Sequence, residues 1–94
     1  MRINSVIWLP DVIEKLEAKH DVTAAEVEEV FRLGAVFRRG PRGKRPGEDL
    51  YKAYGQTEAG RYLFIVFIYK RDRRALILSA RDMTSKERRL YRRG

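Results

Sequence analysis

Cysteine is absent from this 94-residue sequence, and histidine occurs once. The chain therefore has no disulfide, no thiolate metal ligand and no cysteine nucleophile, and one imidazole does not make a metal site. Apolar runs long enough to span a bilayer are also missing. The N-terminus leads into Trp8 and Pro10 rather than into the apolar region of a signal peptide. We therefore expect a cytoplasmic protein without metal or cofactor.

Acidic residues are scarce in the second part of the chain. Residues 1–34 hold four Lys and Arg against seven Asp and Glu, whereas residues 35–94 hold seventeen against six. The formal net charge of +8 thus comes from the second part. Clustered Lys and Arg displace counterions from phosphates, so this asymmetry favours a nucleic-acid partner. The alternative is a basic surface that is only solvated.

Two helices are predicted in the first third of the chain. After Pro10, apolar side chains recur at helical spacing and predict a helix over residues 10–19. Thr23 and Glu26 form a capping box that opens a second helix, and Gly34 ends it.

The rest of the chain favours strands. Apolar or alternating runs predict strands at residues 35–37, 50–54, 62–69 and 75–78, and the apolar opening from Ile3 to Trp8 either makes an edge strand or packs under the first helix. Residues 63–68 are apolar on both faces, which indicates the central strand. The glycines of segment 55–60 permit a tight hairpin. We predict one α+β domain: a curved antiparallel sheet of three to four strands, with the two N-terminal helices on one face.

A short C-terminal helix follows the last strand. Thr84 and Glu87 form a second capping box, so this helix begins at residue 85. Glu87 and Tyr91 are four residues apart and lie on one face of it. Arg81 stands at the end of the preceding strand. The three side chains are therefore expected to meet at a patch able to hold a phosphodiester.

The order and spacing of several short motifs resemble the BrnT family of type II toxins, a branch of the RelE-like ribonuclease toxins. The matching features are Trp8 before the first helix, Lys19-His20 followed by Val22, the segment from Glu48-Asp49 to Tyr54-Gly55, Gly60-Arg61, Ser79-Ala80-Arg81, and Glu87-Arg88 with Tyr91. The resemblance implies a RelE-like fold, RNA cleavage, and a cognate antitoxin that carries a ribbon-helix-helix DNA-binding domain.

RNA cleavage by the neighbouring 2′-hydroxyl needs a base, an acid and cations that stabilise the phosphorane. Arg81 is the first candidate for charge stabilisation and Arg61 the second. His20 has the side chain best suited to proton transfer, with helix capping as its alternative role. Glu87 is a candidate base or simply a cap, and Tyr91 either acts on RNA or packs on the sheet.

Further basic and aromatic residues are candidates for RNA binding. Tyr51 and Tyr54 are three apart on their strand and face opposite ways, whereas Lys52 is in phase with Tyr54. If their strands are neighbours, Lys52, Tyr54, Arg61 and Arg81 form a basic and aromatic surface. Segment 40–47 is rich in Gly, Pro and basic residues and is predicted to be a loop. The remaining candidates are Lys19, Arg88 and three residues of this basic loop, Arg42, Lys44 and Arg45.

The sequence thus predicts a toxin of a type II toxin–antitoxin system, a metal-independent endoribonuclease that cleaves mRNA and inhibits translation. One alternative is a basic RNA- or DNA-binding domain without turnover. Another is a nuclease-inactive relative that acts only through its antitoxin complex, since the segment from Leu9 to Val12 departs from the family pattern.

Overall fold

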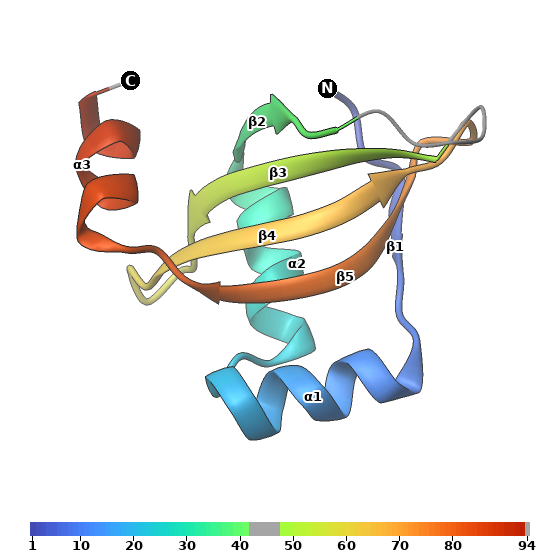
Figure 1. Ribbon diagram of the computed structural model, residues 1–94, viewed down its shortest axis with the longest axis horizontal. Coiled ribbons are helices and arrows are strands. Elements are labelled where there is room, and N and C mark those ends of the chain that lie inside the picture. Colours follow the sequence, from blue (N-terminus) through green and yellow to red (C-terminus); the bar gives the residue numbers. More distant parts are fainter. Residues whose placement is uncertain (42–47, 94) are drawn as a thin grey trace.

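The computed structural model describes residues 1–41 and 48–93. Three helices and five strands follow one another along the chain (Figure 1): β1 Ser5–Ile7, α1 Pro10–His20, α2 Ala24–Leu33, β2 Val36–Arg39, β3 Asp49–Gln56, β4 Tyr62–Tyr69, β5 Arg74–Asp82 and α3 Ser85–Arg93. None of the helices in these two ranges combines the length and the apolar character needed to cross a bilayer.

The strands form one sheet in the order β1-β5-β4-β3-β2. β4 is therefore the middle strand, which confirms the prediction from its apolar sequence. The sheet has five strands instead of the expected three to four, because the short segments β1 and β2 both join it at its edges. β1 pairs with β5 in parallel, and the other pairs are antiparallel. The predicted α+β class is correct.

The helix boundaries follow from local chemistry. Pro10 occupies the first turn of α1. A backbone N–H at this position would have no intrahelical acceptor, so proline, which lacks the N–H, costs the helix no hydrogen bond. At α2, the Glu26 N–H donates to Thr23 Oγ1 at 3.1 Å while the Thr23 N–H donates to Glu26 Oε1 at 3.0 Å. The predicted capping box is thereby confirmed. Gly34 follows the helix with a φ of 102°, a conformation that favours glycine.

The hydrophobic core lies between α1, α2 and one face of the sheet. Figure 1 shows α2 behind the strands and α1 below it along the β5 side. The helices contribute Leu16, Val27 and Val30, their connection contributes Val22, and the sheet contributes Ala53, Leu63, Ile65, Phe67, Ala75, Ile77 and Ala80. All are almost fully buried. Because strand side chains alternate, the residues between them point to the opposite face, which we call the open face.

The turn between β3 and β4 depends on Gly60, which has a φ of 90°. Gly55, expected in this turn, instead belongs to β3. A Cβ at Gly55 would lie 2.7 Å from Cγ1 of the fully buried Val30, so only glycine lets α2 approach this strand so closely.

Gly55→Ala is expected to lower the free energy of unfolding by about 1–3 kcal/mol, because the added methyl group overpacks the core at Val30. Urea denaturation of the variant measures this. The double variant Gly55→Ala/Val30→Ala should lose less stability than the sum of the two single variants, since shortening Val30 makes room for the methyl group. Additive losses would show that the contact is not the cause.

Candidate active site

The open face carries basic and aromatic side chains from four adjacent strands. In the register of the sheet, Val36, Tyr54, Phe64 and Arg81 form one row across it. Arg38, Lys52, Val66 and Ser79 form the next row. The expected grouping of Lys52, Tyr54 and Arg81 is therefore confirmed, and Tyr51 faces the helices, where its ring lies 6.0 Å from that of Phe67. Arg38 belongs to the same surface, although the sequence analysis did not single it out.

A β-bulge brings Arg81 to the open face. Val66 pairs with Ser79 but Phe67 pairs with Ile77, so Leu78 is an extra residue in β5. Ahead of the bulge, Ala75 and Ile77 are buried toward the helices. An unbroken alternation would place residue 81 on that same buried face. The extra residue reverses the alternation, which buries Ala80 and turns Arg81 outward.

Glu87 forms a bidentate ion pair with the two terminal nitrogens of the Arg81 guanidinium. Arg81 Nη1 donates to Glu87 Oε1 at 2.7 Å, and Nη2 donates to Oε2 at 3.0 Å. Nη1 also donates to the backbone oxygen of Asp82 at 3.0 Å. Below the group, the Phe64 ring centroid lies 4.3 Å from Arg81 Cζ, a cation–π contact. The position and the plane of the guanidinium are thus defined by contacts on several sides.

One edge of the Arg81 guanidinium makes no hydrogen bond to the residues that the structure describes. Its Nε–H and the second Nη2–H lie side by side, and within residues 1–41 and 48–93 neither makes a hydrogen bond. Such an edge matches two oxygens of a phosphate group. The side chain is 36% exposed, so a ligand can approach it.

Glu87 joins this site to the start of α3. Its Oε1 accepts from the Thr84 N–H at 2.8 Å, and the Glu87 N–H donates to Thr84 Oγ1 at 3.1 Å. The predicted capping box is confirmed. Chiefly through the Arg81 hydrogen bonds, and with the help of Thr84, the pKa of Glu87 falls to about 2. A carboxylate this acidic is a weak proton acceptor at neutral pH, which favours an orienting role over that of a general base.

The lowered pKa of Glu87 predicts a loss of stability in acid. Because the folded-state pKa is about 2 and the ordinary value is 4.5, the stabilisation is present above pH 4.5 and disappears as pH falls toward 2. Solvent around Arg81 weakens the pair, so we expect about 1–2 kcal/mol. Urea unfolding of wild type and Glu87→Gln between pH 7 and 2 measures it. The stability difference between the two proteins should shrink across this interval, and a constant difference would contradict the assignment.

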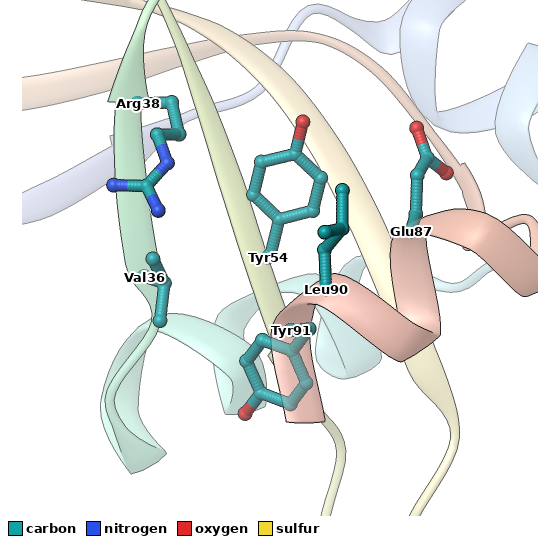
Figure 2. A pocket seen from close by; sticks show the side chains of 6 residues that line it. All are labelled: Val36, Arg38, Tyr54, Glu87, Leu90 and Tyr91. Atoms are coloured by element: carbon teal, nitrogen blue, oxygen red, sulfur yellow. The ribbon is translucent and has the colours of Figure 1, made fainter. Parts of the chain in front are cut away.

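A groove of about 370 Å³ lies between α3 and the open face. It is lined by Val36, Arg38, Tyr54, Glu87, Leu90 and Tyr91, all of which appear in Figure 2. The pKa of Tyr54 is raised, mainly by burial, with Glu87 adding to the effect and Arg81 and Arg38 opposing it. Its hydroxyl therefore keeps its proton at neutral pH and lies within electrostatic reach of all three charged groups.

Tyr91 lies at the other end of this groove. Figure 2 shows its hydroxyl pointing away from the end at which the Tyr54 hydroxyl and the Glu87 carboxylate lie. Its ring packs edge-on against Tyr62, with centroids 6.0 Å apart. Tyr91 and Glu87 therefore share a helix face as expected, but the Tyr91 hydroxyl does not converge on Arg81.

Arg61 does not join the open face. Its Nε donates to Asp82 Oδ1 at 2.7 Å, and its two Nη atoms reach Glu26 and the backbone oxygens of His20 and Asp21. The hydrogen bond to Asp82, supported by Glu26, raises the pKa of Arg61. These partners tie the end of α1 and the start of α2 to the end of β5. The expectation that Arg61 lines one surface with Lys52, Tyr54 and Arg81 is thus corrected, because Arg61 points to the helix side of the sheet.

His20 belongs to this second cluster and not to the groove. It ends α1, and its backbone oxygen accepts from Arg61 Nη2 at 3.0 Å. The pKa of Asp82 is lowered, chiefly by its hydrogen bond to Arg61 and to a smaller extent by the nearby His20. In the part of the chain that the structure describes, no three His, Cys, Asp or Glu residues gather in a way that could hold a metal ion.

The other predicted RNA-binding residues are spread more widely. Lys19 is exposed in the last turn of α1. Arg88 belongs to α3, and its guanidinium stacks on Tyr62, with Cζ 4.4 Å from the ring centroid. Arg42, Lys44 and Arg45 lie outside the described residues. Strand periodicity could have identified Arg38. If the predicted strand 35–37 is extended by one residue, Arg38 becomes part of the strand, and in the sheet it pairs with Lys52.

Comparisons with known proteins agree with this architecture. Residues 8–87 match the family described as the ribonuclease toxin BrnT of type II toxin–antitoxin systems. Among solved structures, the chain resembles the ribonuclease toxin BrnT of Brucella abortus with a TM-score of 0.61. The sequences are 18% identical, and the match covers 86% of this chain and 97% of that chain, which shows a shared fold. A comparison with curated proteins gives no match.

Proposed function

Because this chain belongs to the BrnT family, the ribonuclease toxins of type II toxin–antitoxin systems, we propose that Arg81 stabilises the phosphate charge during RNA cleavage. RNA is the substrate and an antitoxin is the partner that this membership implies. The observation that carries the proposal is the geometry of Arg81. Glu87 orients its guanidinium through two hydrogen bonds, and one bidentate edge remains open.

The reaction we propose requires no metal. The 2′-hydroxyl gives its proton to a solvent water while its oxygen attacks the adjacent phosphorus, so that a new P–O2′ bond forms, a negatively charged phosphorane results, and the P–O5′ bond then breaks. The open edge of Arg81 meets two phosphate oxygens and stabilises their growing charge. The Tyr54 hydroxyl, which keeps its proton at neutral pH, donates that proton to the leaving 5′-oxygen and regains one from solvent. The products are a 2′,3′-cyclic phosphate and a 5′-hydroxyl.

The basic residues beside Arg81 and Tyr54 can bind the phosphates that flank the cleaved bond. Arg38 and Lys52 are cross-strand neighbours on the open face, where they can contact the next phosphates. We propose Lys19, Arg88, Arg42, Lys44 and Arg45 as further residues that contact RNA. We further propose that the substrate is mRNA in the cytoplasm and that the cognate antitoxin carries a ribbon-helix-helix DNA-binding domain.

Incubation of the purified protein with RNA in EDTA tests this function. We expect 5′-hydroxyl and cyclic phosphate ends to accumulate, and Arg81→Ala to slow their formation by roughly 100- to 1000-fold. Binding without cleavage by the wild type would instead support a non-catalytic RNA-binding domain. Cleavage that disappears in EDTA would contradict the metal-independent mechanism.

Variants of the two tyrosines that line the groove distinguish a chemical role of the hydroxyl from a packing role of the ring. Tyr54→Phe should lower the cleavage rate by roughly 10- to 100-fold, since the hydroxyl near Arg81 is lost. Tyr91→Phe should keep the wild-type rate, because its hydroxyl points to the opposite end of the groove. Both variants retain the ring, so thermal melting should stay close to wild type. Equal activity of the two variants would remove Tyr54 from the mechanism.

A further inference from the structure

Exposed aliphatic side chains gather beside the proposed active site. In the described part of the chain, five large hydrophobic residues are classed as exposed: Met1, Leu9, Leu33, Val36 and Leu90. Val36 and Leu90 line the groove of Figure 2. Leu33 lines an adjoining groove of about 490 Å³, which Tyr91 also lines. Since Tyr91 lines both grooves, the three aliphatic residues border one surface, which we call the aliphatic strip.

The aliphatic strip is poorly suited to RNA. Leu33, Val36 and Leu90 offer neither charge, nor hydrogen bonds, nor a flat ring on which a base could stack. Their exposed fractions are 51%, 36% and 57%. Burying such side chains against another apolar surface is favourable, so a cluster of them marks a protein contact. α3 itself contributes no buried residue, and Leu90 therefore adds little to the core.

The surroundings of the strip define the charge of its partner. α3 carries five Lys and Arg and one Glu, and the one Glu is already paired with Arg81. Arg38 lines the groove from the opposite side. A partner segment that covers the strip therefore meets an excess of positive charge, which favours apolar side chains flanked by Asp or Glu.

We propose that the aliphatic strip is the docking site of the cognate antitoxin, which covers it with an amphipathic segment whose apolar residues are flanked by acidic ones. This inference rests on the proposed function and deepens it. Tyr54, Arg38 and Glu87 line the same groove as Val36 and Leu90. A segment seated on the strip therefore excludes RNA from the neighbourhood of Arg81, and neutralisation is steric.

The test compares a strip variant with a matched control. The strip variant is Leu33→Ser/Val36→Thr/Leu90→Ser, which changes polarity without changing charge. Leu9→Ser is the control, because Leu9 is 45% exposed but lies ahead of α1, outside both grooves. The probe is the purified protein encoded by the reading frame adjacent to the gene for this chain. Calorimetry gives its affinity, and RNA cleavage is measured with and without it.

We expect the strip variant to bind the probe roughly 100-fold more weakly, as for the loss of a central apolar contact. Its RNA cleavage, measured relative to its own rate without the probe, should resist inhibition, whereas Leu9→Ser should be inhibited as strongly as wild type. If the triple variant fails to fold by circular dichroism, Leu90→Ser alone replaces it, since α3 buries no residue; a loss of about tenfold is then expected.

Three results would overturn the inference. Unchanged affinity of the folded strip variant would show that the antitoxin binds elsewhere. Weaker RNA binding with unchanged probe affinity would assign the strip to RNA. A change from dimer to monomer in sedimentation, again with unchanged probe affinity, would assign it to a second copy of this chain. If instead Arg81→Ala still cleaves RNA while the strip variant loses the probe, the proposed catalytic role fails and the docking site stands.

Discussion

Arg81→Ala is expected to lower the rate of RNA cleavage by roughly 100- to 1000-fold, the loss typical of a preorganised donor at a developing oxyanion. The variant removes the guanidinium edge proposed to bind phosphate but no part of the core, because Arg81 lies on the open face. Stability should fall by only about 1–2 kcal/mol, since Glu87 keeps its capping bonds to Thr84. Single-turnover cleavage and urea unfolding measure the two effects.

Two further arginine variants sharpen this experiment. Arg81→Lys keeps the positive charge but loses the planar fork, so it should recover only a small part of the rate. Arg74→Ala is the matched control, since Arg74 lies at the opposite end of β5 and pairs with Asp72 at 2.6 Å. It should cleave RNA at the wild-type rate. If both variants lost the same factor in cleavage rate, Arg81 would contribute only positive charge to RNA binding and would have no specific role in the reaction.

Phe67→Ala should destabilise the fold by about 3–5 kcal/mol, a large share of the stability of a domain of this size. Phe67 is fully buried and contacts three aromatic rings, with centroids 5.4 Å away at Phe31 and 6.0 Å away at Phe37 and Tyr51. Thermal melting should shift downward by more than about 10 °C.

Phe64 provides the comparison for this second variant. It lies three residues earlier on β4 but on the open face, where it is only partly buried beneath Arg81. Phe64→Ala should therefore lose less than half as much stability as Phe67→Ala. Similar losses would mean that the two faces of the sheet contribute equally to the core, contrary to the packing described above.

Local sequence signals determined the helices and most of the strands. A capping box acts over three residues, so Thr23 with Glu26 and Thr84 with Glu87 place two helix starts without knowledge of the fold. The apolar run of β4 likewise favours a position between other strands, with helices on one face and partial cover on the other, which made it recognisable as the central strand. Strand alternation also placed Lys52 and Tyr54 on one face and Tyr51 on the other.

The candidate site was predicted only in part. The proximity of Arg81 and Glu87 follows from a strand end and a capped helix that are adjacent in the chain. Arg38, by contrast, reaches the site through pairing between β2 and β3 across a long connection, and no local signal reports that register. Arg61 and His20 looked like candidates for chemistry because their residue types suit it, but their partners come from α1, α2 and β5.

By itself, then, the sequence determined the α+β class, the helix starts, the central strand and the proximity of Arg81 to Glu87, because each depends on neighbours within a few residues. Tertiary structure decided the parallel pairing of β1 with β5, the close approach of Val30 that requires Gly55, and the outward direction of Arg81. The last depends on the bulge at Leu78, where the register between β5 and β4 shifts by one residue. Contacts between distant segments set these features, and no periodicity within one segment encodes them.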